Sequence, residues 1–127
     1  MANCVYVNGQ FLQRHNAAID IEDRGFNFGD AVYEVIFLNN GVLVDENEHL
    51  GRLEYSLSEL DIALPKSRRV LSLLIREVVR LNRISNGFIY LQVSRGVAPR
   101  DHLIPDNITP TLVLMSRSSN LIAQSTI

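Results

Sequence analysis

The sequence of 127 residues contains one cysteine, one lysine and no tryptophan. A lone cysteine, Cys4, excludes a disulfide bond within the chain and a cysteine-rich zinc site. The three histidines stand at positions 15, 49 and 102, too scattered for a recognisable metal-binding motif. No apolar run approaches the roughly 18 residues that cross a bilayer, and the first residues lack the basic region and long apolar core of a secretory signal. We therefore expect a cytoplasmic protein.

The composition is ordinary for a single globular domain. Apolar residues make up 46% of the chain and charged residues 20%, with a formal net charge of −2. This balance creates no basic field that would favour nucleic acid. A chain of this size buries roughly two thirds of its unfolded surface, which is enough for a substantial core.

Turn signals between short apolar segments predict a sheet. Asn8-Gly9 and Asn39-Asn40-Gly41 each separate two such segments, as expected of hairpin turns that need positive φ. Segments rich in β-branched and aromatic residues are expected to form the strands. The predicted strands are residues 5–7, 10–12, 32–38, 42–44, 88–94 and 111–115, and residues 17–31 are expected to form a loop with a short turn.

Two helices are predicted between the fourth and fifth strands. Leucines at positions 50, 53, 57 and 60 recur at spacings of three and four, which indicates a helix from about residue 46 to 61, capped by Asp45 or Asn47. Pro65 interrupts the chain, and Ser67 can cap a second helix that runs to about residue 82. The predicted fold is α+β: an antiparallel-leaning sheet with two helices packed on one face.

The segment 95–102 (RGVAPRDH) carries the clearest chemical signal. Arg100 and His102 are two residues apart, and in an extended segment such residues point the same way. A guanidinium binds a carboxylate or phosphate through two parallel hydrogen bonds, and an imidazole can donate a third. The pair is therefore predicted to converge on one small anion.

Several separated segments, in the same order along the chain, resemble the fold-type IV pyridoxal-phosphate enzymes, the class IV aminotransferases. The segments are 6–11 (YVNGQF), 21–35 (IEDRGFNFGDAVYEV), 47–53 (NEHLGRL), 87–93 (GFIYLQV) and 95–102. Within this family the chain is most similar to the D-amino-acid aminotransferases. The resemblance therefore implies transfer of an amino group between a D-amino acid and a 2-oxo acid on pyridoxal phosphate.

The resemblance also assigns the expected site residues. It implies that Arg52 binds the cofactor phosphate and that Tyr33, Arg100 and His102 bind the substrate carboxylate. It places the pair Arg100 and His102, which we call the carboxylate trap, in the active site of a neighbouring subunit, so that a homodimer is expected. One position departs from the family pattern, because Ala31 stands where a glycine is usual. A need for positive φ there would make the methyl group cost roughly 1 kcal/mol.

The lysine that would hold the cofactor covalently is not expected in this chain. Its one lysine, Lys66, lies in a polar turn that matches nothing catalytic in the family. We expect residues 1–118 to form the N-terminal domain of such an enzyme and residues 119–127 to begin the linker to a second domain, absent here, that supplies the lysine. On this prediction the chain alone has no catalytic residue, binds no pyridoxal phosphate and is inactive.

Three alternatives stay open at this stage. A branched-chain L-amino-acid aminotransferase has the same fold, although the Arg-x-His pair argues against it. An aminodeoxychorismate lyase shares the Asp-Arg-Gly and Gly-Asp segments, but such lyases tend to show Phe-Glu-Thr where this chain has Tyr33-Glu-Val. A non-enzymatic domain that binds a partner through its uncovered surface is the third alternative.

Overall fold

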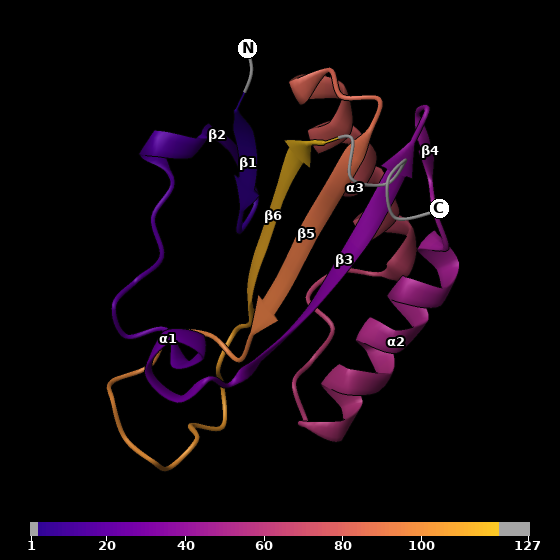
Figure 1. Ribbon diagram of the computed structural model, residues 1–127. Helices are drawn as coiled ribbons and strands as arrows, with labels where there is room; N and C mark the ends of the chain where they lie inside the picture. The colour runs from indigo at the N-terminus through magenta and orange to yellow at the C-terminus, as the bar shows by residue number, and fades with distance from the viewer. Residues whose placement is uncertain (1–2, 120–127) are drawn as a thin grey trace.

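A six-stranded antiparallel sheet backed by two helices forms the part of the chain that the computed structural model describes, residues 3–119 (Figure 1). The strands are β1 (Cys4–Val7), β2 (Gln10–Gln13), β3 (Ala31–Asn39), β4 (Val42–Leu43), β5 (Gly87–Ser94) and β6 (Thr111–Ser118). The helices are α1 (Arg24–Phe28), α2 (Glu46–Glu59) and α3 (Arg68–Asn82), with a 3-10 turn at Arg14–Asn16. None of the helices in this described part is long and apolar enough to span a membrane.

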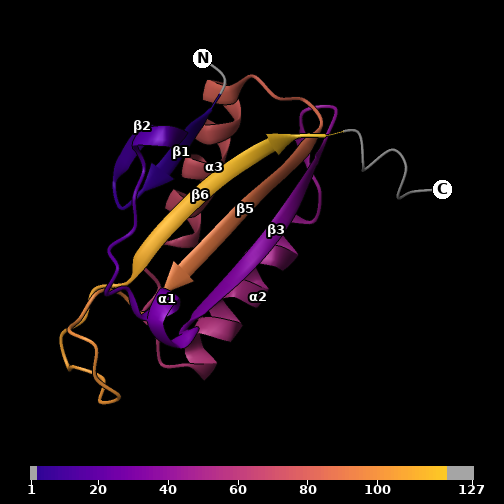
Figure 2. The same cartoon turned by 60° about the vertical axis from the view of Figure 1, so that its left-hand side comes forward.

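The strand order in the sheet is β2-β1-β6-β5-β3-β4, and every paired neighbour is antiparallel. The three long strands β3, β5 and β6 are paired along their full lengths, with Tyr33 opposite Gln92 and Gln92 opposite Val113. Both α2 and α3 lie on one face of these strands, which leaves the opposite face without a covering layer among the described residues (Figure 2).

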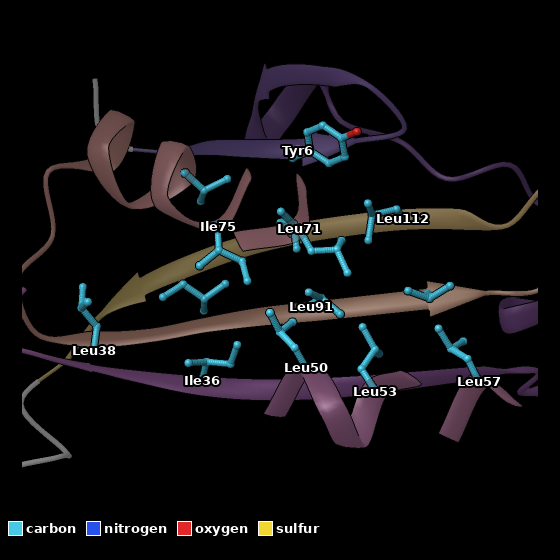
Figure 3. Close-up of a cluster of buried hydrophobic side chains, with 14 of the residues drawn as sticks. Tyr6, Ile36, Leu38, Leu50, Leu53, Leu57, Leu71, Ile75, Leu91 and Leu112 are labelled. Atoms are coloured by element: carbon cyan, nitrogen blue, oxygen red, sulfur yellow. The ribbon is translucent and has the colours of Figure 1, made fainter. Parts of the chain in front are cut away.

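Alternation along the strands sends one set of side chains toward the helices. Ile36 and Leu38 of β3, together with Ile89, Leu91 and Val93 of β5, are fully or almost fully buried on this side. The helices contribute their own apolar faces to the same core (Figure 3). Those residues are Leu50, Leu53 and Leu57 of α2 and Leu71, Ile75 and Val78 of α3. Each buried aliphatic side chain of this kind stabilises the fold by about 1.5–3 kcal/mol relative to exposure.

The two helices begin in different ways. Ser67 caps α3, because its side-chain oxygen accepts a hydrogen bond of 3.2 Å from the Val70 N–H. Asp45 precedes α2 in a left-handed conformation with φ of 55°, and its side chain makes no capping bond. Ser67 is therefore the cap that the sequence predicts, whereas neither acid nor amide at 45 or 47 is seen to cap α2 through its side chain.

The predicted α+β fold, with two helices on one face of an antiparallel sheet, is confirmed. The ends of some strands needed correction, and β4 stops at Leu43 instead of residue 44. The last strand runs to Ser118, three residues beyond the predicted end at 115, because β5 pairs with it along its whole length. Residues 24–28 form a short helical turn within the segment 17–31, which was expected to be a loop with a short turn. The predicted linker at 119–127 lies, apart from Ser119, outside the described residues.

Candidate active site

The first part of the candidate site lies along an edge of β3. Strand β4 pairs only with Leu38 and Asn39, so residues 31–37 of β3 have β5 on one side and no strand on the other within the described chain. Consecutive residues on this edge point to opposite faces of the sheet. Glu34 therefore faces α2, while Tyr33 points to the uncovered face and is 62% exposed.

Glu34 and Arg52 form a forked ion pair between β3 and α2. Arg52 donates from Nε to Oε2 at 2.9 Å and from Nη2 to Oε1 at 2.8 Å. His49, one turn earlier on α2, has its Nδ1 2.7 Å from Oε1 of the same carboxylate. An ionised carboxylate can only accept, so the His49 Nδ1 carries the proton in this contact. Three donor atoms thus satisfy one buried acid.

The exposure of the two side chains in this ion pair differs sharply. The Glu34 side chain is 4% exposed, whereas the Arg52 side chain is 66% exposed. Burial raises the pKa of Glu34, but the hydrogen bonds and charges of Arg52 and His49 outweigh it, and the net pKa is lowered. Arg52 is therefore held on its inner side by a charged carboxylate, and its outer side faces solvent.

The electrostatic surroundings of Arg52 include Glu34 and Tyr33. The pKa of the Arg52 guanidinium is raised by its hydrogen bonds to Glu34 and by the Glu34 charge, with desolvation acting the other way and Tyr33 adding a further increase. The Tyr33 ring stacks on that of Tyr90, with centroids 5.5 Å apart and an interplanar angle of 23°. A phenol and a guanidinium thus flank the same edge of β3.

The second part of the candidate site is the carboxylate trap. The Arg100 guanidinium carbon lies 5.1 Å from the centroid of the Phe28 ring, and the His102 ring centroid lies 5.5 Å from the same point. The two side chains therefore converge on one aromatic ring. The predicted extended geometry is wrong, because bends occur at residues 100, 102 and 103, and Asp101 Oδ1 accepts from the Leu103 N–H at 3.1 Å.

The trap loop and the β3 edge are distinct places in this chain. In both ribbon views the loop between β5 and β6 extends beyond the end of the sheet and away from α2 (Figures 1 and 2). Arg52 belongs to α2, and Arg100 belongs to the loop. Tyr33, on β3, has Tyr90 as its ring partner, whereas the trap residues share Phe28.

The charged residues of the segment 21–35 order the surrounding backbone. Asp23 accepts from the Gly25 N–H at 2.8 Å and from the Ser94 hydroxyl at 2.9 Å. Asp30 pairs with Arg24 at 3.4 Å and with Arg95 through a fork. These contacts hold the segment before β3 in place, whereas Glu34 of the segment 21–35 pairs with Arg52 of α2.

Two further residues bear on the sequence predictions. Ala31 is absent from the residues with positive φ and continues β3 opposite Ser94, so its methyl group meets no left-handed strain. Lys66 is exposed in the turn before α3. It lines a hollow of about 630 Å³ that includes none of Tyr33, Arg52, Arg100 and His102.

Two residues of this region carry no role in the sequence predictions. Phe28 joins Arg100 and His102, and Arg95 donates to Asp30 and to the Leu60 carbonyl at 2.6 Å. The only sequence signal was that both lie inside the conspicuous segments 21–35 and 95–102. No group of three or more His, Cys, Asp or Glu residues suited to a metal occurs in residues 3–119.

Comparison with known proteins identifies the family to which the chain belongs. A family model described as amino-transferase class IV matches residues 31–126. The chain is 47% identical over 104 residues to a D-alanine aminotransferase of Listeria monocytogenes serotype 1/2a (strain 10403S), covering 81% of this chain and 36% of that protein. It is 45% identical over 106 residues to the D-alanine aminotransferase of Bacillus licheniformis, covering 84% and 38% respectively.

Solved structures share the fold at lower identity. A branched-chain amino acid aminotransferase from Escherichia coli superposes with a TM-score of 0.88 at 19% identity, covering 94% of this chain and 40% of that one. The enzyme from Thermoproteus uzoniensis gives 0.80 at 20% identity, covering 91% and 40%. This chain spans less than half the length of these relatives. By the family match and the sequence similarity, the chain belongs to the class IV aminotransferase family, whose members in general depend on pyridoxal phosphate.

Proposed function

We propose that this chain is the N-terminal part of a pyridoxal-phosphate transaminase that moves an amino group between a D-amino acid and a 2-oxo acid. The observation that carries the proposal is that Arg100 and His102 both lie against the Phe28 ring, since a guanidinium and an imidazole held near one point can both donate to a carboxylate. The similarity to proteins named D-alanine aminotransferase supports the D-amino-acid substrate. A cytoplasmic location is part of the same proposal.

In this proposal Arg52 binds the cofactor phosphate. Its bonds to Glu34 come from Nε and Nη2, so the Nη1 group takes no part in them, and most of the side chain faces solvent. An arginine braced on its inner side presents its permanent charge outward without losing much rotamer freedom on binding. Pyridoxal phosphate, when bound, would supply the electron sink of the reaction.

The substrate carboxylate is assigned to Tyr33, Arg100 and His102. A phenol and an imidazole each donate one hydrogen bond, and the guanidinium donates two, so the three together can satisfy both carboxylate oxygens. Fixing the carboxylate fixes which way the α-hydrogen points, and this orientation contributes to rate as well as to binding. The same constraint favours one enantiomer.

We further propose a homodimer in which the carboxylate trap serves the neighbouring subunit. The loop that carries Arg100 and His102 extends away from α2, which carries Arg52 (Figure 2). A loop reaching outward can complete a site on a second copy related by a two-fold axis. The partner copy would then contribute two of the three carboxylate-binding residues.

The remaining machinery is proposed to lie in a second domain beyond the linker at 119–127. Lys66 is exposed, and the hollow that it lines includes neither Tyr33 nor Arg52. The relatives are more than twice as long as the part that this chain covers. The proposed N-terminal domain, residues 1–118, supplies cofactor-phosphate and substrate-carboxylate contacts, and the second domain supplies the lysine that moves the proton.

The direct test is an assay of the full-length protein with pyridoxal phosphate. We expect it to convert D-alanine and 2-oxoglutarate to pyruvate and glutamate at least about 100-fold faster than it converts L-alanine, in line with several kcal/mol of discrimination. Preference for L-leucine would favour the branched-chain alternative. Release of pyruvate from aminodeoxychorismate would favour the lyase, and absence of every activity would favour a binding domain.

A further inference from the structure

We propose that Arg24 is a positioning residue for the carboxylate trap, and this inference rests on the proposed function. Arg24 is 4% exposed, so its guanidinium is enclosed by protein. Its Nη1 donates a hydrogen bond of 2.7 Å to the backbone carbonyl of Asp101. That carbonyl belongs to the residue between Arg100 and His102, so Arg24 holds the trap loop at its centre.

Phe28 forms the surface on which these groups meet. The Arg24 guanidinium carbon lies 4.4 Å from the centre of the Phe28 ring, nearer than the corresponding atom of Arg100 at 5.1 Å. The His102 ring lies 5.5 Å from the same centre. Arginine over an aromatic face is attracted by the electrons of the ring. One ring therefore limits where Arg24, Arg100 and His102 can lie relative to one another.

The charge of Arg24 needs compensation, because Arg100 beside the same ring carries a like charge. Asp30 provides it: its Oδ2 lies 3.4 Å from the Arg24 Nε. Two nitrogens of Arg24 thus have separate partners: Nε donates to the Asp30 carboxylate, and Nη1 donates to the Asp101 carbonyl of the loop. An ammonium group lacks this forked geometry and cannot hold both partners in the same way.

Asp30 is itself fixed to the rest of the fold. Arg95 binds it through both of its carboxylate oxygens. Arg95 also donates to the carbonyls of Leu60 at 2.6 Å and Asp61 at 3.2 Å, just beyond the end of α2. A continuous set of hydrogen bonds therefore runs from the end of α2, through Arg95, Asp30 and Arg24, to the middle of the trap loop. Such a set gives a surface loop a defined position.

Removal of Arg24 would leave Arg100 and His102 chemically intact but poorly placed. A small displacement of groups that orient a substrate can lower the reaction rate substantially. The cofactor phosphate is assigned to Arg52, on a different element, so its affinity should not depend on Arg24. The expected signature is weaker substrate carboxylate binding with unchanged cofactor binding.

The test uses Arg24→Met in the full-length protein, with Arg80→Met as the control. Arg80 is an exposed arginine of α3 paired with Glu77, so its replacement changes charge equally without touching the loop. The half-saturating D-alanine concentration in the single-turnover half-reaction should rise about tenfold or more in Arg24→Met, consistent with loss of a charge-assisted hydrogen bond. It should stay unchanged in Arg80→Met, and the pyridoxal phosphate dissociation constant should stay unchanged in both.

A double-mutant cycle separates positioning from general destabilisation. If Arg24 acts through the trap, adding Arg24→Met to Arg100→Met should weaken D-alanine binding by much less than it does in the unsubstituted protein. Independent, multiplicative effects would overturn the proposal. If Arg24→Met fails to fold, Arg24→Lys, which keeps a charge beside Asp30, should show the same raised half-saturation.

The outcomes also separate this inference from the function beneath it. An unsubstituted protein that does not transaminate D-alanine would overturn the proposed function and, with it, the role of Arg24. An active unsubstituted protein whose Arg24→Met and Arg24→Lys variants bind D-alanine normally would overturn the role of Arg24 alone. Faster hydrogen exchange of amides 100–104 in Arg24→Met, with exchange in α3 unchanged, is the expected structural counterpart.

Discussion

Glu34 and Arg52 are joined by two hydrogen bonds of 2.9 and 2.8 Å that cross from β3 to α2. The acid is buried and the guanidinium is largely exposed. This asymmetry means that Glu34 orients Arg52 without enclosing it, and His49 adds a third bond to the same acid. The pair therefore fixes α2 to β3 and also holds the arginine that is proposed to bind the cofactor phosphate.

Replacing Arg52 with Met should weaken binding of pyridoxal phosphate by the full-length protein about 10- to 100-fold, the range expected for charge-assisted hydrogen bonds. Glu34→Gln should weaken it less, because Arg52 keeps its charge but loses its brace. Tyr33→Phe serves as the matched change on the same edge: it should raise the KM for D-alanine and leave cofactor affinity unchanged. Fluorescence titration of the cofactor and steady-state kinetics measure the two effects, and unchanged cofactor affinity in Arg52→Met would contradict the assignment.

Stability should fall in acid partly through Glu34. Its pKa is lowered in the folded chain, whereas in the unfolded chain it takes its ordinary value of about 4.3. The stabilisation is therefore complete above that value and is lost as the pH falls through the lower folded-state pKa. Denaturant unfolding between pH 7 and 3 should show that the free energy of unfolding falls less steeply with acid in Glu34→Gln than in the unsubstituted protein. Glu77→Gln is the control: its hydrogen bond to Arg80 also lowers the pKa of Glu77, but this pair is much more exposed to solvent than Glu34, so its effect should be small.

Leu53 should be a sensitive core position. It is fully buried beneath the sheet, and Leu53→Ala is expected to lower the free energy of unfolding by about 2–5 kcal/mol. Leu60 is 40% exposed just beyond the end of the same helix, and Leu60→Ala should cost roughly 1 kcal/mol or less. Equal losses in the two variants, measured by denaturant unfolding, would be inconsistent with the core described here.

Gly96 should tolerate no side chain. Its φ is +121°, and an added Cβ would lie 2.0 Å from the Thr109 carbonyl oxygen. Gly96→Ala is therefore expected to destabilise by roughly 3 kcal/mol or more and to disturb the trap loop that follows. Gly9 also has a positive φ, +97°, but open space around it, so Gly9→Ala should cost only about 1 kcal/mol. Thermal unfolding measures both losses: Gly9→Ala reports backbone strain alone, and Gly96→Ala reports backbone strain together with a steric clash.

Lys66 should play no part in holding the cofactor. After incubation with pyridoxal phosphate and reduction with borohydride, peptide mapping of the full-length protein should find the adduct on a lysine outside residues 1–127. The 127-residue chain treated in the same way should form no stoichiometric adduct. Lys66→Arg should keep both adduct and activity, and an adduct on Lys66 would refute the proposed second domain as the source of the lysine.

Local signals explain why much of the fold was predictable. Asn8-Gly9 places both turn residues at positive φ, as the hairpin requires, and the Ser67 cap marks the beginning of α3. The leucine spacing in α2 follows directly from the side of the helix that faces the sheet. Each of these features depends on neighbours within a few residues, so the sequence contains the information.

The connections within the candidate site depend on distant residues and were less accessible. The sequence indicated Arg100 and His102 as a pair, but nothing local indicated that Phe28 would be their common surface. Arg95 reaches an acid 65 residues earlier and a carbonyl 35 residues earlier. Only the sheet register, which sets β3 beside β5, brings these groups together. The roles of Tyr33, Arg52, Arg100 and His102 remain predictions.

The central claim is that one substrate carboxylate is bound by Tyr33 of one subunit and by the carboxylate trap of another. Refolding an equal mixture of Tyr33→Ala and Arg100→Met full-length proteins, each of which should have only weak activity alone, tests it most directly. Mixed dimers would contain one complete site, so about a quarter of the unsubstituted D-alanine transaminase activity should return. A refolded mixture that contains mixed dimers but is no more active than the two variants refolded separately would contradict the claim.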